Sequence, residues 1–537
     1  ILATPGMEGF WAERDVVLVE QRGTRYSIPF LHCEEMSELK LDQLAENPGD
    51  EEKKARQLKA WAACRDRFVS EGVDLGAYNS AENAADIVAV ADALGYDKLN
   101  LYGGSYGSLL AQHIMRDYPQ RVRSAILDAV SPLQHEPNLL YKAHSTDRAL
   151  RLLFSQCQAD RACNKAYPDL ETVYFDLVDR LEAEPAALTI QNPETGETYD
   201  MLLTGERLIA QTRNLLYVTA LLPDLPGAIY DMAAGDYSLL ELIQGQFLFS
   251  LNLADGLYNS VVCTELADFT VEQMAGAEGL YPEVAEAVED LIDEVMLQPC
   301  QAWDVELMDE ALTQSVAGDI PALLLSGEFD PTVPPQMAEV AAEKMTRAYV
   351  YAFPGMGHAT LGRSECAQAM MLDFVADPWQ APDSGCLAEM PGLSFRLPAA
   401  EGALALEPYT NETLGIGGLA PAGWTEVDSG VLARGASAMD QTVLIYDAAP
   451  ISKDDFLGLV AEQFGLAEPP PRSSEREANG QLWTLYETEA QGYPIDFALA
   501  EGDGVTNIVL LISHADEHDA LYQDVFLPAV EALEVLE

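Results

Sequence analysis

The 537-residue sequence contains no apolar run long enough to span a lipid bilayer, so we expect no membrane insertion. Basic residues are also scarce, since 30 Lys and Arg stand against 88 Asp and Glu, for a formal net charge of −58. So acidic a surface repels phosphate groups, which argues against nucleic acid and anionic lipid as partners. The acidic residues are scattered along the chain, and we interpret them as a solvated exterior.

Recognisable metal-binding patterns are missing as well. The chain has no CxxC unit and no Cys/His cluster with zinc spacing, so we expect no metal. The nearest approach is HADEH, which places His514 and His518 one helical turn apart. This segment lacks the glutamate of a zinc-protease helix, and we interpret it as an exposed helix start.

The cysteines point to an oxidising compartment. An even number of cysteines without metal spacing favours disulfides, with buried free thiols in a cytosolic protein as the alternative. The spacing leaves the connectivity open. In sequence order the eight cysteines fall into four neighbouring pairs: Cys33 and Cys64, Cys157 and Cys163, Cys263 and Cys300, Cys366 and Cys386.

The length predicts several domains, and the pattern of strand-like and helix-like segments divides the chain into four parts. In residues 1–132, strand-like and helix-like segments alternate, which indicates parallel strands in an α/β sheet. Residues 133–305 are mostly helical and are interpreted as an insertion, and the α/β pattern resumes over 306–391. Residues 392–537 contain several strands and a helix, and we predict a separate α+β domain there. Elements expected in the first part are strands at 15–20, 98–103 and 121–132 and helices at 81–95, with Ser80 as its cap, and 108–119.

One short motif suggests nucleophilic chemistry. Residues 103–107 read GGSYG, a G-x-S-x-G match between a predicted strand and a predicted helix. A nucleophile on such a sharp turn has a strained backbone, and flanking glycines relieve the crowding. The turn exposes the Ser105 hydroxyl and lets the Tyr106 backbone N–H donate to a developing oxyanion. The alternative, a glycine-rich loop whose serine only caps a helix, fits the flanking elements less well.

A serine nucleophile needs a base and an acid, which in this arrangement follow it in the order serine, acid, histidine. Of the seven histidines, His358 in the loop FPGMGHAT follows a late strand, and we predict that it is the base. For the acid we favour Asp330, at the end of the preceding apolar strand, over Glu328 and Asp128. Pro331 restricts Asp330 to an extended conformation that suits a strand-end loop.

With these residues assigned, the sequence resembles the α/β-hydrolase peptidases that include proline iminopeptidases and tripeptidyl aminopeptidases. The segments that carry the resemblance, over roughly residues 1–391, are DVVLVEQRGTRYSIPFLHC, LYGGSYGSLLAQ, LLLSGEFDPTVPP, PGMGHAT and the late SECAQAM and SGC. The resemblance implies an α/β-hydrolase fold with a mostly parallel sheet and residues 133–305 as a lid over the substrate. It implies that Ser105, Asp330 and His358 form a catalytic triad, and the paired cysteines resemble those of secreted members.

Two features depart from the family pattern. Arg25 occupies the last glycine position of the family's RGTG or RGVG loop. An HGGPG-like oxyanion loop precedes this region in the family, whereas here only TPG at residues 4–6 lies nearby. Loss of one oxyanion donor costs about 3–4 kcal/mol, so we expect a chain that starts at Ile1 to be a processed or incomplete form.

We therefore expect a secreted or cell-envelope serine exopeptidase that needs no cofactor and cleaves peptides near free N-termini, as prolyl or tripeptidyl aminopeptidases do. Such an enzyme must bind the substrate ammonium group, and Glu265 in the predicted lid is our candidate. The alternative for Glu265 is an ordinary solvent-facing glutamate. The alternatives for the whole chain are a carboxylic-ester hydrolase on the same fold and a non-catalytic binding protein that kept the scaffold.

Overall fold

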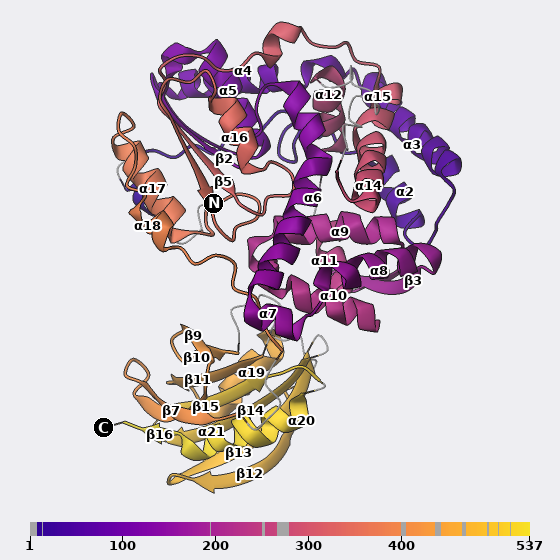
Figure 1. The fold of residues 1–537 in the computed structure, drawn as a ribbon. Helices are drawn as coiled ribbons and strands as arrows, with labels where there is room; N and C mark the ends of the chain where they lie inside the picture. Colours follow the sequence, from indigo (N-terminus) through magenta and orange to yellow (C-terminus); the bar gives the residue numbers. More distant parts are fainter. Residues whose placement is uncertain are drawn as a thin grey trace. The chain divides into compact units, whose positions relative to one another are not determined.

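The computed structural model describes residues 8–536 except 13, 194, 250–252, 266–278, 399–403, 435–441, 464–468, 491–492, 503 and 516. The chain divides into two compact units, residues 1–397 and 398–537 (Figure 1). The first unit contains a parallel sheet and the second an antiparallel sheet, so the predicted fold class is confirmed. The limits of the lid within the first unit stay a prediction.

A four-stranded parallel sheet forms the centre of the first unit, in the order β1-β2-β5-β6. The strands are β1 (Leu99–Gly104), β2 (Val122–Asp128), β5 (Ala322–Gly327) and β6 (Ala348–Phe353). The apolar runs of β2 and β5 follow from burial on both faces, which is typical of parallel sheets. On one face, Ala125 and Leu127 pack against helices α4, α5 and α16, and on the other, Ile126 packs against α17. These helices are α4 (Ser80–Leu94), α5 (Tyr106–Asp117), α16 (Pro335–Ala342) and α17 (Glu365–Ala376).

Residues 15–20 do not form the predicted strand. Val16, Val17 and Leu18 are 40%, 44% and 55% exposed and are in no strand. A valine-rich run becomes a strand only where a neighbouring strand pairs its backbone groups. In this sheet β1 pairs with β2, and residues 15–20 pair with neither strand. The predicted cap of α4 is also one residue off, because the Asn79 side chain accepts the Glu82 N–H at 2.9 Å. Other helices of this unit are α1 (Glu8–Trp11), α2 (Glu34–Asp42), α3 (Asp50–Ser70) and α18 (Gly385–Glu389).

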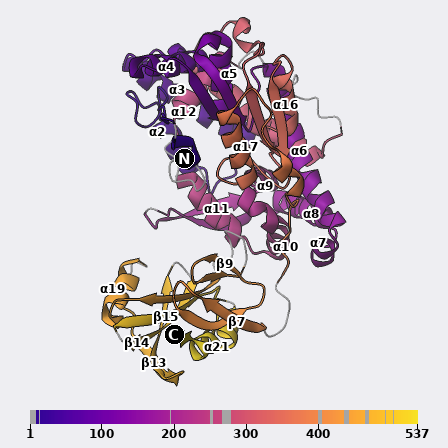
Figure 2. The ribbon, with the colours of Figure 1, turned by 90° about the vertical axis from the view of Figure 1, so that its left-hand side faces the viewer.

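The long connection from β2 to β5 is mostly helical, as predicted. Its helices are α6 (His135–Ala159), α7 (Arg161–Ala166), α8 (Leu170–Ala183), α9 (Gly205–Tyr217), α10 (Leu225–Ala234), α11 (Ser238–Phe249), α12 (Asp255–Glu265), α14 (Pro282–Ile292) and α15 (Gln298–Trp303). Helices α8 to α11 lie together at one end of the unit in both views (Figures 1 and 2). A hairpin of β3 (Ala186–Gln191) and β4 (Thr198–Leu203) was not predicted. Its signal is the alternation of buried Leu188 and Ile190 with exposed neighbours.

Four disulfides join each cysteine to its neighbour in sequence, with S–S distances of 1.97–2.09 Å. Cys33–Cys64 ties the start of α2 to α3, and Cys263–Cys300 ties α12 to α15. The predicted disulfides are present, and no cysteine is free.

The second unit is built on a seven-stranded antiparallel sheet in the order β12-β13-β14-β15-β11-β10-β9, beside a three-stranded sheet, β16-β8-β7. Adjacent residues of its strands pack on opposite faces, so Leu485 lies with Phe526 whereas Tyr486 lies with Val460 of α19. Its elements are β7 (Leu406–Asn411), β8 (Ile416–Pro421), β9 (Thr425–Asp428), β10 (Val431–Ala433), β11 (Val443–Ala449), α19 (Lys453–Gln463), β12 (Arg472–Ala478), β13 (Gln481–Ala490), β14 (Tyr493–Gly502), β15 (Val505–Ile512), α20 (His518–Leu521), α21 (Leu527–Ala532) and β16 (Glu534–Val535).

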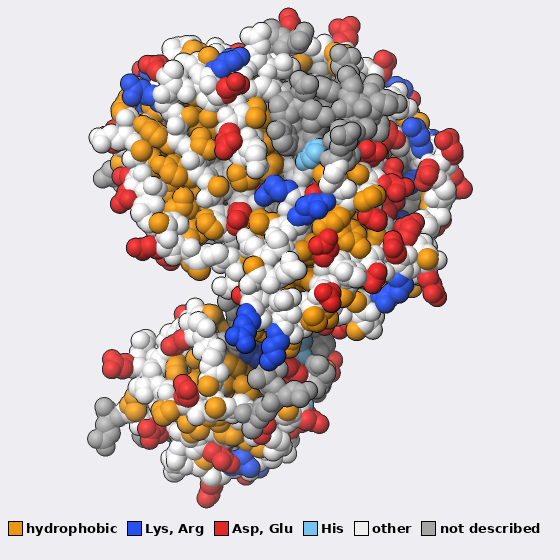
Figure 3. Space-filling view, viewed as in Figure 1, with side chains coloured by type: hydrophobic (Ala, Val, Ile, Leu, Met, Phe, Trp, Pro, Cys, Tyr) orange, Lys and Arg blue, Asp and Glu red, His pale blue; other side chains and the backbone are white. Residues whose placement is uncertain are grey.

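Two surface properties bear on partners. In the described part of the chain, no helix has the length and apolar character needed to cross a membrane. Asp and Glu side chains are spread over the face drawn in Figure 3, with fewer Lys and Arg among them. This distribution agrees with an acidic exterior rather than an acidic tail.

Candidate active site

The candidate site lies at one edge of the parallel sheet. Ser105 directly follows β1, Asp128 ends β2, Asp330 follows β5 and His358 follows β6. Because the four strands are parallel, their carboxyl ends meet at the same edge. Residues more than two hundred positions apart in sequence are thereby brought together.

Ser105 occupies a strained turn between β1 and α5. Its backbone has φ 55° and ψ −122°, a conformation that a non-glycine residue adopts only under constraint. A Cβ on Gly103 would stand 2.1 Å from the Gly107 carbonyl oxygen, so only glycine fits there. A Cβ on Gly107 would meet no atom within 4 Å, so crowding requires the first flanking glycine and not the second.

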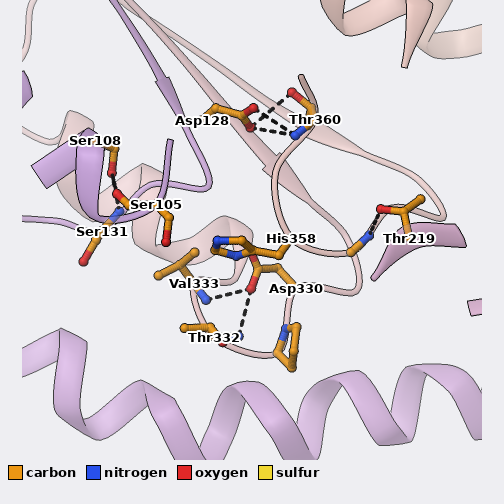
Figure 4. Close-up of polar contacts among 12 residues, drawn as sticks. Ser105, Ser108, Asp128, Ser131, Thr219, Asp330, Thr332, Val333, His358 and Thr360 are labelled. Atoms are coloured by element: carbon orange, nitrogen blue, oxygen red, sulfur yellow. Dashed lines mark hydrogen bonds and ion pairs between the residues drawn. The ribbon is translucent and has the colours of Figure 1, made fainter. Parts of the chain in front are cut away.

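Backbone contacts hold this turn in place. The Ser105 N–H donates to the Asp128 carbonyl oxygen at 2.8 Å. The Ser108 hydroxyl donates to the Ser105 carbonyl at 2.6 Å and accepts the Ser131 N–H at 2.9 Å (Figure 4). Tyr106 is the first residue of α5, where backbone N–H groups lack partners within the helix. Its N–H can therefore serve a ligand atom bonded to Ser105.

His358 is buried between the two other candidate residues. Its Nδ1 lies 2.8 Å from Asp330 Oδ2, and Figure 4 shows the imidazole between Asp330 and Ser105. Among the described residues, the buried Nε2 has no hydrogen-bond partner. The next residue, Ala359, has φ 65°, so the histidine loop is also strained.

Asp330 is the one of the three considered carboxylates that contacts His358. Its Oδ1 accepts the N–H groups of Thr332 and Val333 at 2.8 and 2.9 Å, which leaves Oδ2 for the imidazole. Glu328 instead accepts the Gly355 N–H at 2.9 Å.

Two half-buried arginines place positive charge near this carboxylate. An Arg148 Nη donates to the Asp330 carbonyl oxygen at 3.0 Å, and an Arg213 Nη donates to the Thr332 hydroxyl at 2.8 Å. Burial lowers the pKa of both guanidinium groups, and attraction to Asp330 opposes that change. The two cations therefore offset part of the negative charge of the Asp330 carboxylate.

Comparison with known proteins indicates which class of protein has this arrangement. A family model described as the α/β hydrolase fold matches residues 11–182, and one described as TAP-like protein matches residues 286–386. The serine protease Hip1 of Mycobacterium tuberculosis is 24% identical over 374 residues, which cover 65% of this chain and 69% of Hip1. Hip1 of Mycobacterium bovis matches over the same extent. Together with the fold, these matches support a serine peptidase on the α/β-hydrolase fold.

Solved structures are similar only at low scores. An epoxide hydrolase variant from Bacillus megaterium is 16% identical, with a TM-score of 0.24, and covers 57% of this chain and 78% of its own. Cyanobacterial PsbP from Synechocystis is 15% identical, with a TM-score of 0.19, and covers 26% of this chain and 96% of its own. Neither likeness adds to the family assignment.

In this α/β hydrolase, Asp128 contacts the histidine loop rather than the histidine. Its two buried carboxylate oxygens accept the Thr360 N–H at 3.0 and 2.9 Å, the Thr360 hydroxyl at 3.1 Å and the Leu361 N–H at 3.0 Å. The Tyr102 hydroxyl donates to it at 3.2 Å. Burial raises the pKa of Asp128, and these hydrogen bonds oppose the rise. Sequence reasoning considered Asp128 only as an alternative acid, although its place at the end of β2 shows that it lies at the same sheet edge.

Glu265, at the end of α12, is buried and 8% exposed, so the solvent-facing interpretation is wrong. One carboxylate oxygen accepts the Ser80 N–H at 2.6 Å and the other accepts the Ser80 hydroxyl at 3.0 Å. That hydroxyl lies 2.9 Å from the Tyr106 hydroxyl, next to the candidate nucleophile. Burial raises the pKa of Glu265 to about 7, and the hydrogen bonds to Ser80 only partly offset the rise.

The end of α9 contributes a residue that sequence reasoning missed, Tyr217. The Tyr217 ring stacks on the His358 imidazole, with centroids 3.9 Å apart and an interplanar angle of 22°. The Tyr217 carbonyl accepts the His358 N–H at 2.9 Å, and the Thr219 hydroxyl accepts the Gly357 N–H at 3.0 Å. A Cβ on Gly357 would stand 2.8 Å from the Tyr217 carbonyl oxygen. The glycine before His358 was the available signal for this close approach.

The described residues contain no group of three or more His, Cys, Asp or Glu arranged to hold a metal ion. In the HADEH segment, His518 Nε2 lies 2.9 Å from Asp496 Oδ2. The His514 ring packs edge-on against Tyr493 at 5.3 Å. Both histidines are thus engaged with protein groups of the second unit.

Proposed function

We propose that this serine peptidase is an extracytoplasmic exopeptidase that cleaves peptides near free N-termini through an acyl-enzyme on Ser105. The observation that carries the proposal is the arrangement around His358. Its Nδ1 lies 2.8 Å from a carboxylate, and its unpartnered Nε2 belongs to a ring that Figure 4 draws between that carboxylate and Ser105. This is the order of groups that a nucleophilic serine requires.

In the proposed mechanism, Ser105 Oγ attacks the scissile carbonyl carbon while its proton passes to His358 Nε2. The carbonyl electron pair moves onto the oxygen, where the Tyr106 N–H stabilises the negative charge. When the C–N bond breaks, His358 returns the proton to the leaving amine. Water then repeats the sequence on the acyl-enzyme, and Asp330 stabilises the imidazolium at each stage.

The preference for free N-termini rests on Glu265. The described hydrogen-bond partners of its carboxylate are the N–H and the hydroxyl of Ser80, which are both neutral. None of these partners is therefore a cation. A substrate ammonium group would supply that missing cation and stabilise the charged form of the carboxylate. The four disulfides support the extracytoplasmic location.

Substrate series test the proposal. Wild-type protein should hydrolyse tripeptidyl and prolyl p-nitroanilides with free N-termini, and acetylation of the terminus should lower kcat/KM at least about tenfold. Ser105→Ala should abolish both turnover and labelling by a fluorophosphonate. Hydrolysis of p-nitrophenyl acetate without hydrolysis of any anilide would assign an esterase instead. Absence of labelling at Ser105 would contradict the nucleophile.

Amine recognition has its own test. Glu265→Gln should raise KM for free-terminus substrates and leave KM for acetylated ones unchanged, because the amide cannot pair with an ammonium group. KM for the free-terminus substrates should fall in wild type as pH rises through about 7, where Glu265 ionises, and rise again above about 8, where α-amino groups lose their proton. Steady-state kinetics from pH 5 to 9 measure both. An unchanged low-pH limb in Glu265→Gln would exclude this carboxylate.

A further inference from the structure

We propose that Arg148 is a positioning residue for the triad, whose guanidinium group holds the turn that carries Asp330. Arg148 lies on α6, in the predicted lid, whereas the turn follows β5 of the parallel sheet. The inference rests on the proposed function, since it needs Asp330 as the acid that orients His358. It makes α6 part of the support of the triad.

The Arg148 side chain holds the turn at two points. Its Nη1 donates to the Glu328 carbonyl oxygen at 2.6 Å, and its Nη2 donates to the Asp330 carbonyl oxygen at 3.0 Å. The planar guanidinium group fixes the directions of both hydrogen bonds, and the positive charge of the donor strengthens each of them. One side chain therefore sets the spacing of two backbone carbonyls on either side of Phe329.

The turn has little freedom to find other partners. On the side of the histidine loop, the Phe329 N–H donates to the Met356 carbonyl oxygen at 2.7 Å. Phe329 and Asp330 are both 0% exposed, so a carbonyl that lost its guanidinium partner would be left buried without a donor, which is costly. Without Arg148 the turn would shift to relieve this loss, and the Asp330 carboxylate would shift with it.

A second arginine on the same helix shows what is particular to Arg148. Arg151, one helical turn further on, pairs with Asp147 at 2.6 Å, and its side chain is 45% exposed. Arg148 is half-buried, and both of its described hydrogen bonds go to backbone carbonyls of the acid turn. The Arg148 guanidinium thus holds backbone, whereas that of Arg151 pairs with a carboxylate of its own helix.

This support bears on the chemistry because the carboxylate must meet the imidazole in one orientation. Asp330 Oδ1 accepts two N–H groups of its own turn, and Oδ2 lies 2.8 Å from His358 Nδ1. Both oxygens therefore move whenever the turn moves. A misplacement of about 1 Å in a catalytic arrangement can cost about 100-fold in rate. The contacts of Arg148 fix the backbone from which this carboxylate projects.

The test is Arg148→Met, which removes both donors. We expect kcat on a free-terminus p-nitroanilide and the rate constant of fluorophosphonate labelling at Ser105 to fall about 10- to 100-fold, with KM changed less than about threefold. Arg148→Lys keeps the charge but lacks the planar fork, and its kcat should lie between those of wild type and Arg148→Met. The matched control Arg151→Met, on the same helix, should keep both rates within about threefold of wild type.

A double-variant series shows whether Arg148 acts through Asp330. In an Asp330→Asn background, Arg148→Met should slow labelling by less than about threefold, because the carboxylate that it positions is already gone. An equal loss in both backgrounds would indicate a general structural role and overturn the inference, as would wild-type kcat in Arg148→Met. If Arg148→Met does not fold, Arg148→Lys takes its place in the series and is judged in the same way. Wild-type labelling in Asp330→Asn would instead overturn the triad of the proposed function.

Discussion

At the scale of single residues, three acidic side chains with similar sequence contexts are held by different partners. Asp330 contacts the imidazole, Glu328 contacts a loop N–H, and Asp128 contacts the two residues that follow Ala359. The sequence motifs predicted Ser105, His358 and Asp330 as candidates because order and strand ends are local signals. The contacts of Asp128 and Tyr217 could not be predicted, because they depend on which distant loops meet at the sheet edge.

These different contacts predict different losses. Asp330→Asn should lower kcat about 10⁴-fold at little cost in stability, because the imidazole loses the group that fixes its tautomer and stabilises its charge. Asp128→Asn should lower kcat far less but reduce the free energy of unfolding by about 1–3 kcal/mol, because the amide NH₂ cannot accept from the Thr360 and Leu361 N–H groups. Steady-state kinetics and urea unfolding measure the two. The reverse ranking of the kcat losses would make Asp128 the acid.

At the scale of elements, the predictions succeed where a pattern is complete within one segment. The several strands and the helix predicted within residues 392–537 are present, among them β11, β13, β14, β15 and α19. The strand expected at residues 15–20 does not form, because a strand also requires a neighbouring strand that pairs with it. The β3–β4 hairpin was not predicted, because it lies within a region whose other segments are helical. The predicted strand-to-helix turn at Ser105 is present. It could be predicted because the glycine, strand and helix signals all lie within residues 99–117.

Two alanine substitutions test this turn. Gly103→Ala should destabilise the protein strongly and abolish turnover, because its Cβ would overlap the Gly107 carbonyl group. Gly107→Ala should leave the melting temperature equal or slightly higher, because the site is open and alanine favours the helix by up to about 1 kcal/mol. Thermal unfolding followed by circular dichroism compares them. Equal melting temperatures for both variants would show that the turn relaxes to accept a Cβ.

At the scale of the whole molecule, the change of texture near residue 391 predicted a second domain, and the chain divides after Leu397. The second unit has apolar clusters on both faces of its own sheet. Expressed alone, residues 398–537 should therefore unfold cooperatively, and residues 1–397 should keep their anilide hydrolysis within about threefold. Denaturant titration of residues 398–537 measures the cooperativity, and steady-state kinetics of residues 1–397 measure the hydrolysis. A non-cooperative transition for 398–537 would show that its core needs the rest of the chain.

The junction of Tyr217 and Thr219 with the histidine loop also limits how substrates can enter. A swing of α9 away from the sheet would pull the carbonyl from the His358 N–H and lift the ring from the imidazole. If substrates entered through such an opening, His358 would lose both contacts at the moment of entry. We therefore expect α9 to stay in place during turnover, so that His358 keeps both contacts.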